Sequence, residues 1–477
     1  MITFDIQTLN AFFEENKNFF INARVNKIQQ PTRREFILTL RNQSESKQLY
    51  ININPKYYHI CFMNEDNGKK RLLEIPKQPP MFCMQLRKYL ENSKVIRVNL
   101  PKNERILELY FESSNNIGDN IYPCLAVELM GKYSNVILYN TDSKIIIGCA
   151  HNVGAEKSRL REVYGGIPYI YPPKQNQSTV PKFKSLICEY DFNQYGSVNN
   201  LIDTYYADQI AFAKFSEKKA YYKSITAQKL NKVKKSLSKM ENKIKSDSDL
   251  DKYRLYGDLL MANIYQLKDY SRFAEVYDYE NNKNITMPLD ETKTVKDNAN
   301  KFYKLYTKSK NAREKLSELI NSYTVQKDYL QQIQYFLESA ENIEDLNEIS
   351  PEITEEKPSK KEKNKISEIP KIEYPDGTRI YIGKNNKQND YIISKLASDE
   401  DLWFHVHNNA GSHVLLKTQN LTDELIMTCA KFAKEHSSVK NSSKIGVIYT
   451  KRKYLRKPPG ANLGYVTYKN EKEIVLD

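Results

Sequence analysis

Short apolar segments with the alternation of β-strands dominate the first third of the chain. Examples are Glu35–Leu40, Arg105–Phe111 and Asn135–Tyr139, and helical patterns lie between such segments. Successive side chains of a strand point to opposite faces, so this alternation is typical of a sheet with at least one face on a core. The pattern predicts an α+β domain over residues 1–176.

The apolar spacing changes to the period of a helix after residue 201. Leu230, Val233, Leu237, Met240 and Ile244 follow one another in steps of 3, 4, 3 and 4, which keeps them on one stripe of a helix. A second run has a similar stripe, made of Leu316, Leu319, Tyr323, Leu330, Ile333 and Leu337. Turn-forming residues lie between the two runs, at Asp278–Pro288. We therefore predict a long antiparallel coiled-coil hairpin over residues 201–346.

Two polar segments interrupt this organisation. Residues 177–200 are polar and poorly periodic, which indicates a linker. Eight of the thirteen residues of Ile353–Lys365 are charged and the segment offers no pattern for a core, so residues 347–370 are predicted to be a disordered tether. The remaining segment, 371–477, is predicted to be a small α/β module, and the whole chain a multidomain α+β protein.

One segment of that module has a distinctive pattern. Asp401–Leu416 contains the only tryptophan of the chain and half of its histidines, and it has the alternation of a β-hairpin. Trp403, His405 and His407 are expected on one face of the first strand, with Phe404 and Val406 on the other.

A second segment of the module combines cations with aromatic residues. Tyr449–Gly464 begins with two tyrosines interleaved with five cations and ends in a loop rich in proline and glycine; the cations are Lys451, Arg452, Lys453, Arg456 and Lys457. Cations contact phosphates and aromatic rings stack on bases, so with Tyr454 this pattern favours a nucleic-acid surface. The alternative is a solvated basic rim.

Composition agrees with a polyanionic partner. Lysine and arginine exceed aspartate and glutamate by 14 in 477 residues, and the isoelectric point is about 9.1. No apolar run has the length that spans a bilayer, and the opening residues do not resemble a signal peptide. The six cysteines form no C-x-x-C pair, which indicates reduced thiols. We expect a cytoplasmic protein with no membrane partner.

The chain shows no catalytic motif. It has no phosphate-binding G-x-x-x-x-G-K-[ST] loop, no G-x-S-x-G elbow and no H-E-x-x-H pair. His405, His407 and His413 could converge on a metal ion, but no fourth ligand lies near them in sequence. We therefore expect a non-enzymatic protein with no cofactor and no metal.

Several segments together resemble the NFACT family, in its bacterial RqcH-type branch of ribosome quality control proteins. In chain order they are Phe4–Ala11, Ala23–Pro31, Met84–Leu90, Val127–Val136, Asn298–Tyr306 and Ile382–Asp390, followed by the two C-terminal segments above. The resemblance implies a glycosylase-like N-terminal domain, a coiled coil and a C-terminal RNA-binding module. A helix-hairpin-helix region usually precedes the coiled coil, and the short interval between Pro173 and Tyr206 indicates that it is missing or reduced here.

The resemblance also implies functional residues. The Asp-Arg pair that engages transfer RNA in bacterial members corresponds to Glu104-Arg105, for which the alternative is a surface ion pair. A second family motif is matched by Glu128, Lys132, Ser134 and Asn135, with Tyr133 at its usual histidine. In the C-terminal module the RNA-binding candidates are Trp403, His405, His413, Lys451, Arg452, Lys453, Tyr454, Arg456 and Lys457. For Trp403, the alternative is a core residue.

By this resemblance the protein acts on obstructed large ribosomal subunits. It would bind ribosomal RNA and transfer RNA, the alanine acceptor in bacterial relatives, beside a stalled nascent chain held as peptidyl-tRNA. The ribosome would then add a C-terminal alanine tail that marks the chain for degradation, with the protein acting as a monomer that positions the RNA. Alternatives are a ribosome-binding relative without tailing activity and a fibronectin-binding surface adhesin. A DNA glycosylase is disfavoured, because position 2 is Ile and no zinc-finger cysteines follow.

Overall fold

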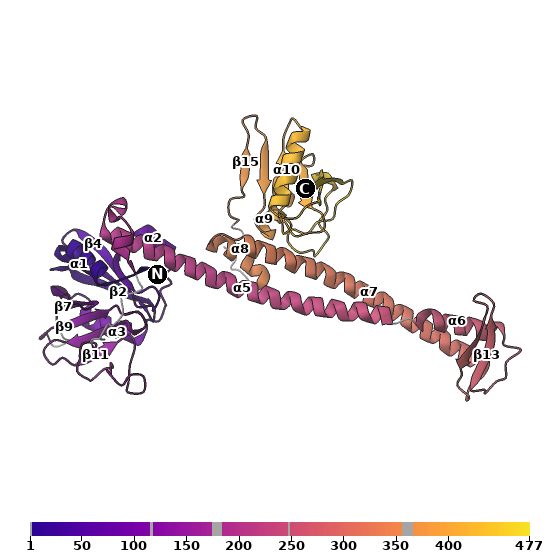
Figure 1. The fold of residues 1–477 in the computed structure, drawn as a ribbon, viewed down its shortest axis with the longest axis horizontal. Coiled ribbons are helices and arrows are strands. Elements are labelled where there is room, and N and C mark those ends of the chain that lie inside the picture. The colour runs from indigo at the N-terminus through magenta and orange to yellow at the C-terminus, as the bar shows by residue number, and fades with distance from the viewer. Residues whose placement is uncertain (1, 115–117, 174–183, 247–248, 355–365) are drawn as a thin grey trace. The chain divides into compact units, whose positions relative to one another are not determined.

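The computed structural model describes residues 2–114, 118–173, 184–246, 249–354 and 366–477. The chain forms two compact units, Met1–Ser216 and Glu217–Asp477. Helices and sheets occur in both units, as the sequence predicts (Figure 1).

An antiparallel sheet is the body of the first unit. Its strands follow the order β11-β10-β9-β7-β6-β2-β3-β4-β5, with β8 paired to β7. They are β2 (Arg24–Thr32), β3 (Glu35–Asn42), β4 (Glu45–Asn52), β5 (His59–Met63), β6 (Lys94–Asn99), β7 (Ile106–Ser114), β8 (Asn120–Ile121), β9 (Pro123–Glu128), β10 (Asn135–Asn140) and β11 (Ile146–Cys149). The short β1 (Ile2–Thr3) lies outside this sheet and pairs in parallel with β12 (Lys184–Ser185).

Helices cover one face of this sheet. Helix α1 (Ile6–Phe20) begins where the Asp5 carboxylate accepts a hydrogen bond of 2.9 Å from the Thr8 amide, a standard N-cap. Helix α3 (Met81–Leu90) and the first turns of α5 (Val198–Ser246) pack beside it on the same core. The short α2 (Glu65–Lys70) follows β5. A separate core on β7, β9, β10 and β11 contains the stacked rings of Tyr139 and Tyr169.

The predicted linker over 177–200 contains secondary structure in the part that the structure describes. From residue 184 it forms β12, α4 (Leu186–Glu189) and a 3-10 turn (Phe192–Tyr195) before α5 begins. Leu186 is fully buried, and the Ser185 hydroxyl donates a hydrogen bond of 2.9 Å to Asp5. The segment packs on the rest of the first unit, because a few apolar side chains among many polar ones suffice to bury it. Residues 177–183 lie outside the described residues.

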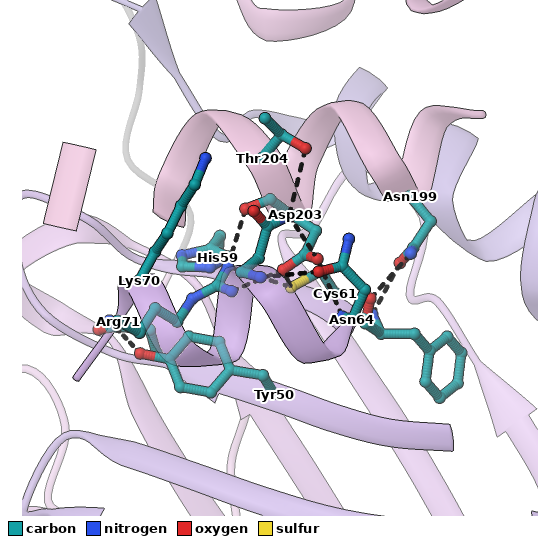
Figure 2. A network of polar contacts seen from close by, with 12 residues as sticks. Tyr50, His59, Cys61, Asn64, Lys70, Arg71, Asn199, Asp203 and Thr204 are labelled. Atoms are coloured by element: carbon teal, nitrogen blue, oxygen red, sulfur yellow. Dashed lines mark hydrogen bonds and ion pairs between the residues drawn. The ribbon is translucent and has the colours of Figure 1, made fainter. Parts of the chain in front are cut away.

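Polar contacts fix the start of α5 on the sheet (Figure 2). The Asn199 side chain accepts a hydrogen bond of 2.7 Å from the Phe62 amide and donates one of 2.8 Å to its carbonyl. One turn later, Asp203 accepts hydrogen bonds from the Asn64 amide at 3.0 Å and from the Asn67 side chain at 2.9 Å. These bonds join α5 to β5 and α2, segments that lie far from it in the sequence.

Two long helices run side by side in the second unit, namely the continuation of α5 and α7 (Val295–Ser339) (Figure 1). Leu230, Val233 and Leu237 of the predicted seam are buried together with Leu330 of α7. The apolar stripe predicted for the second helical run is buried less regularly on α7, where Leu319 is 47% exposed.

A small subdomain occupies the segment where the sequence predicts only a turn. Helix α6 (Asp249–Ala262) is followed by an antiparallel pair of strands, β13 (Phe273–Asp278) and β14 (Lys283–Pro288). Ala274, Val276 and Met287 are buried against α6 and α7. Alternation over only six residues, among many polar ones, was too weak a signal to reveal these strands.

The helical part also extends beyond residue 346. Helix α8 (Ile343–Ile353) begins with a capping box between Asn342 and Asp345 and buries Leu346, Ile349 and Ile353. The first residues of the predicted tether at 347–370 are therefore helical, and most of its charged run, 355–365, lies outside the described residues.

The C-terminal module is built on a second antiparallel sheet, in the order β15-β16-β18-β17-β19-β20. Its elements are β15 (Lys371–Glu373), β16 (Arg379–Ile382), α9 (Asn386–Tyr391), which continues into a π-helical turn (Ile392–Leu396), β17 (Leu402–Val406), β18 (Val414–Lys417), α10 (Asp423–Glu435), β19 (Ile445–Lys451), a 3-10 turn (Arg452–Tyr454) and β20 (Lys472–Leu476). The predicted hairpin is confirmed, because β17 pairs antiparallel with β18. Its two faces also agree: Phe404 and Val406 face the core with α10, and Trp403 faces a second core.

Among the described helices, none has both the length and the apolar character that crossing a bilayer requires. All six cysteines are free, and all but Cys188 are buried.

Candidate nucleic-acid interface

Arg105 lies directly before β7, at the end of a tight turn. The Glu104 amide donates a hydrogen bond of 3.1 Å to the Pro101 carbonyl, and Asn103 has a positive φ of 64°. Asparagine tolerates this conformation better than most residues. The turn places Arg105 at the rim of the sheet, where its side chain is half-buried.

Tyr58 holds the Arg105 guanidinium group. Arg105 Nη1 donates a hydrogen bond of 3.2 Å to the Tyr58 hydroxyl, and the guanidinium carbon lies 5.8 Å from the centre of the Tyr58 ring. The same hydroxyl lies 2.5 Å from Thr3 Oγ1. Because Tyr58 restricts the conformers of Arg105, less entropy is lost when the cation meets an anion. No sequence motif pointed to Tyr58, since it lies 47 residues from Arg105.

The loop after β9 packs against the same tyrosine. Gly131 begins a 3-10 turn (Gly131–Tyr133) with a φ of 64°, and a side chain there would lie 3.7 Å from the Tyr58 ring. The positive φ favours glycine, and the contact brings the loop next to Arg105. The Ser134 hydroxyl closes the turn by accepting a hydrogen bond of 2.9 Å from the Met130 amide.

Three segments therefore meet around Tyr58, and we call Tyr58, Arg105, Gly131 and Lys132 the Arg105 site. Lys132 is exposed, with its ammonium 4.8 Å from the centre of the Tyr133 ring. The segments also carry exposed Lys56 and Lys102. A guanidinium held in place among exposed ammonium groups suits a phosphate backbone, because arginine supplies directed hydrogen bonds and lysine supplies charge.

Glu104 does not form the surface ion pair with Arg105 that the sequence left open as an alternative. The side chain is half-buried, and no ion pair joins it to Arg105 within the described part of the chain. The functional expectation for Glu104 remains a prediction.

Three other residues of the family motif have structural roles. Glu128 is 1% exposed; it accepts hydrogen bonds of 2.9 and 2.7 Å from the Arg161 guanidinium and one of 3.0 Å from the Tyr169 hydroxyl. Burial, with the Glu128 charge added, raises the pKa of Tyr169, so its hydroxyl remains a donor. The Glu128 carboxylate is therefore covered and saturated with donors, which gives it a structural role, and its contact with transfer RNA stays a prediction.

Ser134 and Asn135 are likewise buried. Asn135 donates a hydrogen bond of 2.9 Å to the His151 carbonyl and accepts one of 3.0 Å from the His151 amide. Together with the Ser134 bond to Met130, these contacts fix the loop that carries Gly131 and Lys132. Both residues therefore support the loop, and their contact with transfer RNA stays a prediction.

Trp403, His405 and His413 form a ring cluster inside the C-terminal module. Trp403 is 2% exposed and His413 is 3% exposed, with Trp403 stacked on His405 at 5.8 Å and edge-on to His413 at 5.2 Å. Burial lowers the pKa of His405 to about 4 and that of His413 well below its ordinary value. Both imidazoles are neutral at pH 7. The burial of Trp403 agrees with the core alternative, His405 is half-buried, and contact of these three residues with RNA stays a prediction.

The remaining histidine of the hairpin points elsewhere. His407 Nδ1 lies 2.8 Å from Glu473 Oε1, at the surface. Within the described residues no group of three histidine, cysteine, aspartate or glutamate side chains is arranged to hold a metal ion.

The basic segment of the module is largely paired with acids of its own unit. Glu400 accepts hydrogen bonds from Lys451 at 2.7 Å and Lys453 at 2.6 Å, and these bonds lower the pKa of Glu400 to about 2. Lys457 contacts Asp390, and the Arg452 Nε donates a hydrogen bond of 2.7 Å to the Ile393 carbonyl.

The positive surface that is left is smaller than the count of cations suggests. Arg456 is exposed, and Tyr454 is half-buried with the Lys453 ammonium 5.5 Å from the centre of its ring. Of the predicted set, Arg456 and Tyr454, with the paired but exposed Lys453 and Lys457, retain the geometry for contact with phosphate and base.

These features define a class, namely multidomain proteins with a nucleic-acid-binding module and a long helical segment. Comparison with known proteins is more specific. The family model described as NFACT N-terminal and middle domains matches residues 5–189 and 177–369, and the model described as the NFACT protein RNA binding domain matches residues 372–470. The chain belongs to the NFACT family.

Curated relatives match over the whole chain. The protein named Rqc2 homolog RqcH of Bacillus subtilis is 26% identical over 566 aligned positions, covering 100% of this chain and 98% of the relative. Its namesake in Streptococcus pneumoniae strain D39 is 27% identical, covering 99% and 97%. Among solved structures, the C-terminal part of the fibronectin/fibrinogen-binding protein from Streptococcus suis is 26% identical and covers 55% of this chain and 94% of that one, with a TM-score of 0.43.

Proposed function

We propose that this protein is a non-enzymatic ribosome quality control factor that binds the large ribosomal subunit and transfer RNA. The observation that carries the proposal is the match of the NFACT N-terminal, middle and RNA-binding models along one chain, together with full-length relatives named Rqc2 homologs. In this proposal the protein recruits transfer RNA, the alanine acceptor, to a stalled peptidyl-tRNA, and the ribosome extends the nascent chain with an alanine tail. The protein works in the cytoplasm as a monomer.

The Arg105 site is the proposed contact with transfer RNA. Its support is physical: Tyr58 holds Arg105 in place, Gly131 takes the positive φ that the loop beside Tyr58 requires, and Lys132 adds exposed charge. Positioning is the whole contribution of such a site, since the reacting groups belong to the ribosome. In this proposal the N-terminal domain is glycosylase-like, and the antiparallel coiled coil reaches along the large subunit as a ruler.

The experiment is to isolate the tagged protein from its own cells at moderate salt and to sequence the RNA that co-purifies. A variant with Glu104→Ala and Arg105→Ala is the comparison. Large-subunit RNA with one dominant transfer RNA, the latter lost in the variant, is the expected result. Recovery of neither RNA from the unaltered protein would overturn the proposal.

A second candidate is a ribosome-binding relative that has lost tailing. One observation favours it: 566 aligned positions for a chain of 477 residues mean that the Bacillus relative carries residues for which this chain has no counterpart. A missing helix-hairpin-helix region would produce such a gap. Large-subunit RNA without an enriched transfer RNA would select this candidate, and binding of purified protein to fibronectin, with no RNA recovered, would select an adhesin.

A further inference from the structure

The first residues of the chain lie beside the Arg105 site. Thr3 Oγ1 lies 2.5 Å from the hydroxyl of Tyr58, the same group that holds the Arg105 guanidinium. Arginine can only donate hydrogen bonds, so the Tyr58 oxygen accepts from Arg105 and its own proton is available for Thr3. Side chains from three segments are therefore joined in one series, from Thr3 through Tyr58 to Arg105.

The residues that follow Thr3 fix its position. The ends of a chain are poorly ordered unless they are tied down. Here Phe4 is fully buried in the core of the first unit, and the Asp5 carboxylate caps α1 by accepting hydrogen bonds of 2.9 and 2.7 Å from the amide and the hydroxyl of Thr8. Thr3 is thus one residue from a core anchor and two residues from a helix cap.

The segment that leads into α5 supports Thr3 from the other side. Strands β1 and β12 pair in parallel, and the register places Thr3 opposite Ser185. The Ser185 hydroxyl donates a hydrogen bond of 2.9 Å to Asp5, and the next residue, Leu186, is fully buried. Strand β1 is therefore held between the core of the first unit and β12.

Tyr58 can restrict the conformers of Arg105 only as far as Tyr58 is itself fixed. The Gly131 loop packs against the Tyr58 ring, and Thr3 meets the Tyr58 hydroxyl. Among the hydrogen bonds of the described residues, Thr3 and Arg105 are the two side-chain partners of that hydroxyl. A long, flexible cation loses much conformational freedom when it meets an anion, and a support that is already rigid reduces this loss.

We infer that Thr3 is a positioning residue of the Arg105 site, which acts on transfer RNA through Tyr58 and Arg105 without contacting the RNA. This inference rests on the proposed function and deepens it, because it adds β1 and its partner β12 to the elements that prepare the site. The guanidinium is then set jointly by the first residues of the chain and by the segment that leads out of the sheet into α5.

The test compares Thr3→Val with Thr3→Ser in the full-length protein. Valine keeps the branched shape that suits a strand and removes the hydroxyl, whereas serine restores the hydroxyl. Affinity is measured by filter binding with bulk transfer RNA from the same cells, at one fixed salt concentration. Thr3→Val should bind about fivefold more weakly, as expected for one lost hydrogen bond, and Thr3→Ser should stay within about twofold of the unaltered protein.

A matched control makes the same chemical change elsewhere in the first unit. Thr141 is half-buried like Thr3, and its hydroxyl donates a hydrogen bond of 2.6 Å to the Tyr122 carbonyl. It follows the end of β10, whereas the Gly131 loop precedes the start of that strand. Thr141→Val should bind transfer RNA like the unaltered protein, and urea denaturation should show that both valine variants are folded under the conditions of the assay.

A double-mutant cycle separates positioning from a general effect on the fold. Thr3→Val is also made together with Arg105→Ala, where it should leave the remaining affinity unchanged, because no guanidinium is present to be positioned. A structural role alone would weaken binding by the same factor whether Arg105 is present or not.

The outcomes distinguish this inference from the proposed function. Unchanged binding in Thr3→Val, with binding weakened in Arg105→Ala, would overturn the inference and leave the proposed function standing. Equal losses from Thr3→Val with and without Arg105, or a loss that Thr3→Ser does not restore, would also overturn it. Failure of the unaltered protein to bind transfer RNA would overturn the proposed function itself.

Discussion

Arg71 and Asp203 form an ion pair that is shielded completely from solvent. Arg71 Nη1 lies 2.6 Å from Asp203 Oδ1 and both side chains are 0% exposed (Figure 2). The Arg71 guanidinium also lies 4.7 Å from the centre of the Tyr50 ring and donates a hydrogen bond of 3.0 Å to the Asp203 carbonyl. Because Arg71 follows α2 and Asp203 lies on α5, the pair fastens the long helix to the sheet of the first unit.

Asp203→Ala should lower the free energy of unfolding of the first unit by about 3–5 kcal/mol, since it leaves a buried cation without its partner. Urea denaturation followed by circular dichroism measures this. Replacing both residues, with Arg71→Met and Asp203→Leu, should cost much less, because no charge is then buried. Equal losses of stability in the single and double variants would contradict the importance of the charge.

Tyr58→Phe should weaken transfer-RNA binding about tenfold while the fold is kept, because the hydroxyl that holds the Arg105 guanidinium is removed. Filter binding with the transfer RNA that co-purifies measures the affinity. Tyr279→Phe removes a hydroxyl from a ring that is 79% exposed and far from Arg105 in sequence, and should have no effect. An unchanged affinity in Tyr58→Phe would show that Arg105 needs no support.

Substitutions of Glu128 and Lys132 should distinguish an effect on the stability of the first unit from an effect on RNA binding. Glu128→Ala should destabilise the first unit by about 3–5 kcal/mol, because the Arg161 guanidinium, 12% exposed, loses its bidentate partner. Lys132→Gln should change stability by less than about 0.5 kcal/mol and reduce the salt slope of RNA binding by about one. Urea denaturation and salt titration distinguish the two effects. Weaker RNA binding by Glu128→Ala, together with unchanged stability, would instead support Glu128 as a direct contact.

The C-terminal module should lose stability as pH falls from about 6.5 toward 4. Burial lowers the pKa of His405 to about 4 in the folded protein, so between these values the unfolded chain binds more protons and acid favours unfolding. The loss from His405 alone is roughly 2 kcal/mol at pH 5. Fluorescence of Trp403, the only tryptophan, reports this module selectively. His405→Gln should reduce the acid sensitivity, and the same pH dependence in that variant would contradict the assignment.

Sequence reasoning succeeded where a feature depends on neighbouring residues. The alternation at Trp403 to Val406 identified both faces of β17, and the spacing of Leu230, Val233 and Leu237 identified the buried stripe of α5. It failed where weak local patterns are stabilised by distant partners. The strands β13 and β14 and the segment around Leu186 look like loops in sequence, yet they pack because α6, α7 or the main sheet covers their few apolar residues.

In the candidate site, too, the sequence identified features of neighbouring residues but not contacts between distant ones. Family motifs singled out Arg105 and Lys132, but their spacing could not reveal that Glu128, Ser134 and Asn135 face inward to support the loop. Nor could the row of cations at 451–457 show how many are paired, since Glu400 and Asp390 come from other segments.

The sequence by itself therefore determined that the chain mixes helices and sheets, which side chains of α5 and β17 face a core, and the excess of positive charge, because periodicity and charge are properties of consecutive residues. Only the tertiary structure decided that Tyr58 holds Arg105, that Asp203 neutralises Arg71 and that Trp403 belongs to a core. These are contacts between residues far apart in the chain, and their existence depends on how the elements pack.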